Sequence, residues 1–341
     1  MKKLNKFLEE SGEKKFRFNQ IIDSIYRNSV ISFSDMSFLS SDLRKNLEKN
    51  INILDFIVLK IIGKVEDNFL KALLKLNDGN LIETVLISPK PGFWTCCISS
   101  QVGCPCNCSF CATGKMGFIR NLTDKEIYDQ VLFWNNYIKN NELIDSKKVD
   151  SIVYMGMGEP LLNYKNVKDS LKFLTDKRYF NFGNRNISIS TIGIKDTLPV
   201  LSKDFPQINL AISLHFSFNE KRSKYIPYNL NTNLKDIKNF LDKRLIKNKR
   251  KIFLEYIMIK EINDSKKDLN NLINFIKSIN NYYLLHVNLI PCNDNNFGFI
   301  PSKIEDILYF KNTLNKNNIN TTIRKSLGNE YYSACGQLAN K

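Results

Sequence analysis

The amino-acid sequence predicts an α/β protein whose largest part is a partial barrel of parallel strands. After Gly92, short apolar runs typical of buried strands alternate with amphipathic segments typical of helices. This alternation predicts a parallel sheet, either an open doubly wound sheet or a complete or partial barrel. Polar residues directly follow several of the expected strands, and in barrels that end of the strands carries the functional site. The position of these residues therefore favours the barrel.

Residues 1–55 are expected to form a small helical module, because apolar residues recur at helical spacing in the stretches 18–25 and 39–47. From 56 to 92 the pattern changes to short strand-like runs. The stretch 77–80 reads Asn-Asp-Gly-Asn, which is a hairpin signal between two of these runs. We therefore expect a short antiparallel β extension that connects the helical module to the barrel.

Residues 93–341 form the expected barrel, which carries a C-terminal cysteine loop. Thr123 and Glu126 have the spacing of a capping box, which predicts that a helix begins there. The strands expected in this part are 94–99, 151–156, 186–190, 209–214, 252–259, 284–290 and 320–324.

The chain is strongly basic, with 50 Lys and Arg against 34 Asp and Glu, a formal net charge of +16. Such a balance favours a polyanionic partner such as nucleic acid. Lysine, asparagine and isoleucine are abundant throughout the chain, however, so an AT-rich genome explains the charge equally well. A local cluster of six cationic residues in 243–251 also fits a solvated helix end whose cations complement the helix dipole.

The N-terminal ten residues contain no apolar run of signal-peptide length, so secretion is not expected. The most apolar stretch, 51–65, is broken by Asn52, Asp55, Lys60 and Gly63 and is too short to span a bilayer. We therefore expect a cytoplasmic protein with no membrane partner.

Six of the eight cysteines lie between Cys96 and Cys111, where paired disulfides would be geometrically awkward. Cys104, Cys108 and Cys111 have the spacing Cys-x3-Cys-x2-Cys. Three thiolates can hold three irons of a cubane iron–sulfur cluster and leave the fourth iron open to another ligand. The alternative is a structural zinc site with Cys106 as the fourth thiolate, although zinc ligands usually come from two separated knuckles.

Matches to one family run in order along nearly the whole chain. The stretch 155–163, for example, reads Met-Gly-Met-Gly-Glu-Pro-Leu-Leu-Asn. With these motifs the chain resembles the radical S-adenosylmethionine RNA methyltransferases of the RlmN/Cfr family. The stretches that carry the resemblance are 97–114, 155–163, 189–191, 212–215, 289–293 and 333–339.

The resemblance implies a (βα)6 radical-SAM barrel and a 4Fe-4S cluster on Cys104, Cys108 and Cys111. S-adenosylmethionine would bind at the open iron, with two molecules used per turnover. Considered alone, Gly158 also fits a strand-to-helix turn and Ser190 a helix cap. The residues that match the family's S-adenosylmethionine-binding positions are Gly158, Glu159, Ser190, Ser213, Leu214, His215 and Asn293.

The same resemblance implies Cys335, Cys97 and Glu83 as catalytic residues. In the family, one S-adenosylmethionine methylates the thiolate at the Cys335 position. A second yields a 5′-deoxyadenosyl radical, which takes hydrogen from the S-methyl group, and the resulting methylene radical adds to the base. Cys97 would release the product by forming a disulfide with Cys335. Glu83 matches the proposed acceptor of the ring proton, although a carboxylate on a strand face needs no such role.

Carbon 2 of an adenine in 23S rRNA and in tRNA is the substrate position that the resemblance implies. Pro160 and Pro291 resemble the RlmN side of the family, whereas 111–114 and 189–193 also occur on the Cfr side. A Cfr-type carbon-8 methyltransferase that confers antibiotic resistance is therefore the alternative. A zinc-stapled RNA-binding protein is the non-enzymatic alternative.

Further partners follow from the implied chemistry. Flavodoxin or ferredoxin would supply electrons, and thiols would reduce the disulfide. The helical module would bind RNA, since the stretch 15–18 interleaves charged and aromatic residues suited to phosphates and bases. The two phenylalanines of this stretch equally fit a buried core. We expect a monomer.

Overall fold

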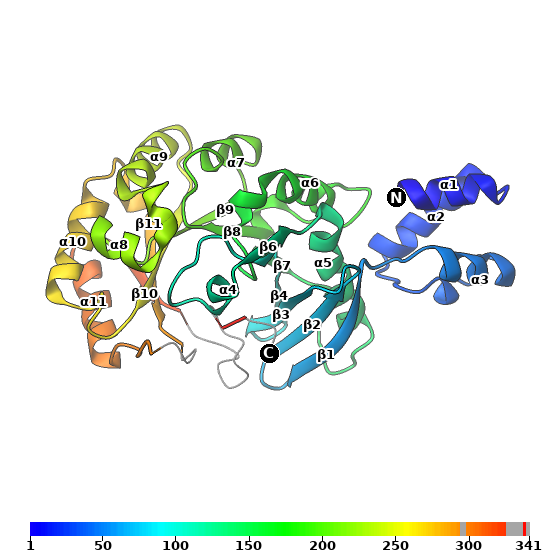
Figure 1. Ribbon diagram of the computed structural model, residues 1–341, viewed down its shortest axis with the longest axis horizontal. Helices are drawn as coiled ribbons and strands as arrows, with labels where there is room; N and C mark the ends of the chain where they lie inside the picture. Colours follow the sequence, from blue (N-terminus) through cyan, green and yellow to red (C-terminus); the bar gives the residue numbers. More distant parts are fainter. Residues whose placement is uncertain (294–297, 325–336, 339–341) are drawn as a thin grey trace.

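The computed structural model describes residues 1–293, 298–324 and 337–338. Three helices come first and lie together at one end of the molecule, beside the α/β body (Figure 1). The helices are α1 (Lys2–Glu10), α2 (Lys15–Tyr26), α3 (Ser41–Asn50), α4 (Ala112–Lys115), α5 (Asp124–Lys139), α6 (Tyr164–Thr175), α7 (Leu198–Asp204), α8 (Asn219–Tyr225), α9 (Leu234–Lys247), α10 (Lys266–Lys277) and α11 (Ile304–Lys316).

Most strands join one sheet in the order β1-β2-β3-β4-β7-β8-β9-β10-β11-β12, and β5 and β6 form a separate pair. The strands are β1 (Phe56–Lys64), β2 (Phe69–Leu76), β3 (Leu81–Lys90), β4 (Phe93–Cys97), β5 (Gln101–Gly103), β6 (Phe118–Asn121), β7 (Ser151–Tyr154), β8 (Ile187–Thr191), β9 (Asn209–Ser213), β10 (Ile252–Met258), β11 (Leu285–Pro291) and β12 (Asn320–Ile323).

The large sheet has a parallel part and an antiparallel part. Strands β4 and β7 to β12 pair in parallel, and helices follow them on the outside (Figure 1). Strands β1 to β3 continue the same sheet from β4 in antiparallel pairing. The expected α/β class, helical module and antiparallel extension are therefore confirmed. β12 is the seventh strand of the parallel part, one more than a (βα)6 unit provides.

Local signals in the sequence explain where several elements begin and end. Thr123 and Glu126 form the predicted capping box at the start of α5. Gly79, in the turn between β2 and β3, has φ +86°, a left-handed conformation that glycine adopts without strain. Both the helix start and the hairpin agree with the sequence prediction.

Aromatic side chains hold the N-terminal helices against the body. The ring of Tyr26 in α2 contacts four rings from α5, α6 and the segment after α6, at centroid distances of 4.9 to 6.1 Å. Phe16 of the same helix is 49% exposed, whereas Phe18 packs against the core. The stretch 15–18 thus divides between the surface and the core.

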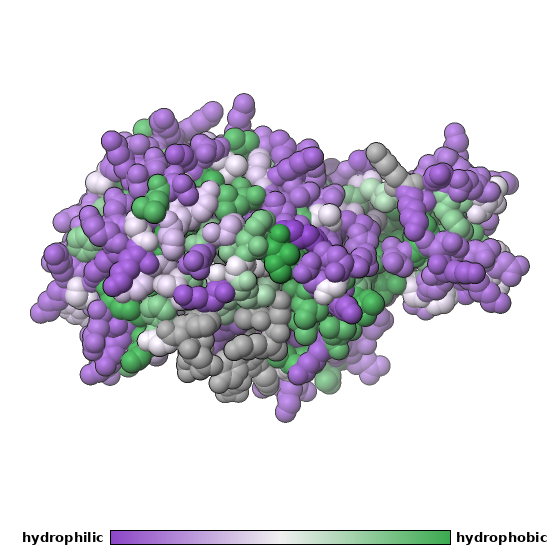
Figure 2. Space-filling view, viewed as in Figure 1, coloured by the Kyte–Doolittle hydropathy of each residue, from purple (hydrophilic) through white to green (hydrophobic). Residues whose placement is uncertain are grey.

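The surface of the N-terminal helices is largely hydrophilic, whereas apolar residues gather beside β1 and β2 (Figure 2). Ile57 and Leu59 of the edge strand β1 are both exposed. Among the described residues, no helix has the length and apolar character needed to cross a membrane.

Candidate active site

The cysteine loop lies between β5 and α4 and is held by backbone contacts. The Cys104 N–H donates to the Gly117 carbonyl at 2.9 Å, and the Ser109 N–H donates to the Tyr225 carbonyl in α8 at 2.9 Å. Gly114 has no room for a side chain, because a Cβ there would lie 2.9 Å from the backbone of Cys108. This close packing explains why position 114, three residues after the third cysteine of the motif, is a glycine.

The loop presents three partly exposed cysteines, Cys104, Cys108 and Cys111, whereas Cys106 is only 2% exposed. A hydrogen bond to the Cys104 side chain, together with burial, holds the pKa of the Cys106 thiol far above its ordinary value. The Cys106 side chain is thus buried within the loop and hydrogen-bonded there to Cys104. Thiolates are the donors that iron–sulfur clusters require, so the three other cysteines fit the cluster expected from the sequence.

In the described part of the chain, no group of three His, Cys, Asp or Glu side chains converges on a point where one metal ion could be held. The thiolates of a cubane cluster bind three different irons and need not converge in this way. Burial raises the pKa of Cys108, and it raises that of Cys111 to about 11. Both thiols would be deprotonated by the positive charge of bound iron.

Among the predicted S-adenosylmethionine-binding residues, Glu159 is held in place by several hydrogen bonds. Its carboxylate is 3% exposed and accepts backbone hydrogen bonds from Leu161 at 3.0 Å and Ile192 at 2.9 Å. Its own N–H donates to the Gln101 side chain at 2.8 Å. Gly158 has φ +100°, and a Cβ there would lie 2.5 Å from Gln101. Glycine is therefore required at 158 by both conformation and space.

Burial raises the pKa of Glu159 to about 7, and the two backbone N–H groups oppose the rise. The folded state holds this proton more tightly than the unfolded chain. The contribution of the protonated Glu159 to the free energy of unfolding is therefore complete below pH about 4.5 and disappears as the pH rises through 7. The Glu159→Gln variant has no titrating group at this position. Relative to the variant, the wild type should therefore lose roughly 2 to 3 kcal/mol of unfolding free energy between pH 5 and 8.

Urea denaturation of both proteins at several pH values measures this difference. Subtracting the two curves removes the contributions of every other titrating group, so the comparison reports on Glu159 alone. A pH-independent difference would show that Glu159 has an ordinary pKa.

The remaining predicted binding residues follow the next strands of the sheet. The Ser190 and Ser213 hydroxyls lie 3.0 Å apart on the neighbouring strands β8 and β9. Leu214 is fully buried directly after β9. Asn293 is buried after β11, at the same sheet edge as Gly158 but four strands along. The structure thus places these residues at or just after the ends of β7, β8, β9 and β11, along one edge of the sheet.

His215 has a left-handed backbone, φ +57°, directly after Leu214. Its ring Nδ1 accepts the Ile257 N–H at 3.2 Å, so Nε2 carries the proton in the neutral ring. Burial lowers the pKa of His215 to about 3, which keeps the ring neutral. Phe110 of the cysteine loop packs edge-on against this ring at 5.3 Å. The loop and the strand edge therefore meet at His215.

Arg222 in α8 is a residue that sequence reasoning missed. It is fully buried and donates to the carbonyls of Leu214 at 3.1 Å, Ile192 at 2.7 Å and Ser213 at 3.3 Å. Burial lowers its pKa to about 10, so it stays charged at neutral pH. Arg222 ties together the strand ends that carry the predicted binding residues. No sequence signal distinguishes it, since α8 resembles a charged surface helix.

Glu83 lies in a buried ion pair that the sequence also did not predict. Its Oε1 lies 2.8 Å from the Lys71 Nζ, and the two side chains are 0% and 4% exposed. Ser99 donates to the Glu83 carbonyl at 2.6 Å and accepts the Met157 N–H at 2.8 Å. Ser99 thereby connects Glu83 to the segment that leads to Gly158. The hairpin signal could have suggested the pairing, because it sets the register of β2 against β3.

Cys97 projects from the same sheet face as Glu83 and Lys71. Lys71, Val85 and Cys97 stand in register on β2, β3 and β4, and Glu83 is two residues from Val85. Since strand side chains alternate between faces, these residues share one face. The other face carries Thr84, whose hydroxyl accepts the Trp134 indole N–H from α5 at 3.1 Å. Cys97 and Glu83 therefore point away from α5.

Cys335 lies outside the described residues. Leu338, three residues further along the sequence, is described and is 5% exposed. Its carbonyl accepts a hydrogen bond of 2.7 Å from the Thr113 hydroxyl in α4. The chain close to Cys335 in sequence is thus attached to the helix that directly follows the cysteine loop.

Comparisons with known proteins identify the family of this chain. Residues 1–53 match the family described as "Ribosomal RNA large subunit methyltransferase N-terminal domain", and residues 98–276 match the "Radical SAM superfamily". The chain is similar to a protein of Pseudothermotoga lettingae named "Probable dual-specificity RNA methyltransferase RlmN". The two are 41% identical over 97% of this chain and 93% of the relative.

A relative of the same name from Thermotoga neapolitana is 39% identical over 96% of this chain and 92% of its own length. Among solved structures, the chain is similar to "a radical SAM methyltransferase from Sphaerobacter thermophilus". The TM-score is 0.91 at 32% identity, with 99% of this chain and 97% of that chain covered.

Proposed function

The chain belongs to the RlmN-type radical SAM RNA methyltransferases, and from that premise we propose that it methylates carbon 2 of an adenine in 23S rRNA and in tRNA. The names of its relatives support the dual specificity. The observation that carries the proposal is the shared sheet face of Cys97 and Glu83, joined through Ser99 to the segment before Gly158. Family membership also makes the chain an enzyme, so the zinc-stapled binding protein is not supported.

Cys104, Cys108 and Cys111 would hold the 4Fe-4S cluster that radical SAM proteins use. When bound, this cluster supplies the electron that cleaves S-adenosylmethionine. The packing of Phe110 on His215 fixes the loop against the strand edge, so the cysteines keep their position. Arg222 stabilises that edge through its hydrogen bonds to the Leu214 and Ile192 carbonyls.

Glu159 and Gly158 would receive the ammonium group of S-adenosylmethionine. The pKa of Glu159, about 7, lets the carboxyl ionise at neutral pH when a cation comes close. Ser190 and Ser213 offer hydroxyls on the next two strands, and the partly exposed His215 offers a neutral Nε2–H donor. These groups suit the polar ribose and amino-acid parts of the molecule.

Cys335 would carry the methyl group as S-methylcysteine, formed from the first of two S-adenosylmethionine molecules. After its methylene carbon has bonded to the adenine, the adduct would give up one electron, returned to the bound cluster, and Glu83 would take the ring proton. The Cys97 thiolate would then attack the Cys335 sulfur, and the released methylene carbon would take up a proton to become the methyl group. That attack breaks the bond from sulfur to the methylene carbon and forms the disulfide. The ion pair with Lys71 holds the Glu83 carboxylate in place for this proton transfer.

Nucleoside analysis tests the proposal directly. The anaerobically reconstituted protein, given S-adenosylmethionine, dithionite and either unmodified 23S rRNA or tRNA, should produce 2-methyladenosine in both. Mass spectrometry of digested RNA, compared with synthetic standards, separates the two methyl positions. Formation of 8-methyladenosine alone would replace this proposal with the Cfr-type alternative.

Three further expectations belong to the proposal. Residues 1–55 would bind RNA, residues 56–92 would connect them to the barrel, and residues 93–341 would carry the chemistry. A flavodoxin or ferredoxin would supply electrons, and a thiol reductant would reopen the disulfide. The protein would act as a monomer in the cytoplasm, where its RNA substrates are.

A further inference from the structure

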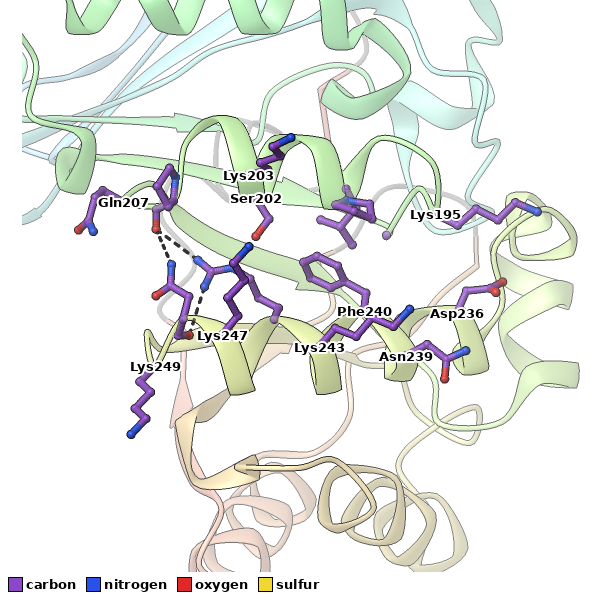
Figure 3. Close-up of a pocket in the computed structure, with 16 residues that line it drawn as sticks. Lys195, Ser202, Lys203, Gln207, Asp236, Asn239, Phe240, Lys243, Lys247 and Lys249 are labelled. Carbon is purple, nitrogen blue, oxygen red and sulfur yellow. Dashed lines mark hydrogen bonds between the residues drawn. The ribbon is translucent and has the colours of Figure 1, made fainter.

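A groove of about 860 Å³ runs between α7 and α9 on the outer helical layer (Figure 3). Lysine side chains from both helices line it, and Phe240 of α9 lies between them. The lining residues are Gly193, Lys195, Leu198, Pro199, Ser202, Lys203, Pro206, Gln207, Asp236, Asn239, Phe240, Lys243, Arg244, Lys247, Asn248 and Lys249.

The residues that line this groove are predominantly positively charged. Six of its lining residues are Lys or Arg, and Asp236 is the one carboxylate among them. The five lysines are exposed, and none forms an ion pair with another described residue. Lysines gathered in this way repel one another, and a polyanion relieves the repulsion while releasing its own counterions.

The cationic cluster in 243–251 only partly acts as a helix end. Arg250 binds the side chains of Gln207 at 2.8 Å and Asn209 at 3.1 Å, and Arg244 binds the Pro206 carbonyl at 3.2 Å. These two arginines therefore join structural elements. Lys243 and Lys247, by contrast, extend from α9 without a described partner, one turn apart (Figure 3).

One end of the groove adjoins the candidate active site. Gly193 and Lys195 follow Ile192, whose N–H binds Glu159 and whose carbonyl binds Arg222. The other end reaches Lys249, shortly before β10 begins. The groove therefore leads from the edge that carries the site along the outside of the barrel. A chain molecule that enters the site can continue into it.

The floor of the groove is partly apolar. Phe240 is partly exposed between the lysines, and Leu198 and Pro199 lie across from it on α7. An aromatic ring among cations offers a stacking surface for an unpaired base beside phosphate contacts. A protein partner with an acidic segment would use the lysines but has less need for the ring.

We propose that the groove between α7 and α9 binds the sugar–phosphate backbone of the substrate RNA as it leaves the active site. The proposal rests on the proposed function for the identity of the RNA. Lys203, Lys243 and Lys247 would contact phosphates, and Phe240 would stack on a base. The contacts would be independent of sequence, which suits an enzyme that acts on two different RNAs.

Binding of fluorescein-labelled tRNA to the full-length reconstituted protein, followed by anisotropy at several salt concentrations, tests the proposal. Lys243→Gln/Lys247→Gln should weaken binding roughly 10- to 30-fold at 0.1 M salt and reduce the slope of log K against log salt by about 1.5. The matched control is Lys266→Gln/Lys316→Gln on α10 and α11. It removes the same charge from two other exposed lysines and should leave both quantities near the wild type.

Equal effects of the two double variants would overturn the proposal, because they would reflect net charge alone. A second measurement uses the wild type: bound tRNA should protect Lys243 and Lys247 from chemical acetylation more than Lys266 and Lys316. Equal protection of the four lysines would also contradict RNA binding in the groove. Neither measurement needs methylation. A protein that makes no 2-methyladenosine but passes both tests would therefore refute the proposed function and still support RNA binding in the groove.

Discussion

Cys97→Ala should stop turnover after the methylene carbon has bonded to the adenine, leaving RNA covalently attached to the protein. Cys97 is the residue proposed to break the bond to the Cys335 sulfur, and alanine offers no thiol for that step. The attached RNA should therefore accumulate to nearly one equivalent per protein, with 2-methyladenosine formation reduced at least 100-fold. Denaturing gel electrophoresis with and without ribonuclease treatment measures the adduct.

The chain provides a matched control in the neighbouring residue. Cys96 is fully buried on the opposite face of β4, where burial raises the pKa of its thiol. Cys96→Ala should lose some stability and keep turnover. Cys335→Ala in the Cys97→Ala background should abolish the adduct, because no sulfur is left to carry the methyl group. An adduct that persists there would contradict the S-methylcysteine route.

Lys71→Met should destabilise the protein by about 3 to 5 kcal/mol, because it leaves the buried Glu83 carboxylate without its cation. The same change removes the ammonium group that holds the Glu83 carboxylate in place, so methylation should also fall sharply. Lys71→Met/Glu83→Met removes both charges and should recover much of the stability but none of the activity. Urea denaturation and nucleoside analysis measure the two effects.

Lys75→Met is the control for this experiment, since Lys75 lies on the same strand but is exposed. Its effect on stability should remain within about 0.5 kcal/mol. Lys71→Arg keeps the charge and should retain part of the activity. If Lys71→Met is fully active, Glu83 does not depend on this pairing, and the role given to Lys71 is wrong.

Most of the fold could be predicted from local patterns. All seven strands expected in 93–341 are present, and the capping box and hairpin occur where the sequence places them. These features depend on residues that are close in sequence, so their signals survive without knowledge of the tertiary structure. The extension of one continuous sheet from β12 through β4 to the edge strand β1 depends on long-range pairing, which no local pattern encodes.

The candidate site divides in the same way. The cysteine spacing and the glycine and glutamate at 158 and 159 are contiguous motifs, and the sequence alone was enough to single them out. Arg222 could not be found, because its role depends on carbonyls contributed by three separate segments. Lys71 escaped notice since a lysine in a strand is usually solvated, and only the packing around the hairpin buries it.

The sequence by itself determined the chemical class of this protein, because the cysteine loop and the motifs that follow the strands are read in chain order. The tertiary structure alone decided which side chains work together. It put Cys97, and not Cys96, on the sheet face of Glu83, paired Glu83 with Lys71, and brought the lysines of α7 and α9 to one groove. The physical reason is that thiol chemistry belongs to a residue type, whereas burial, charge pairing and facing surfaces arise only when distant segments pack.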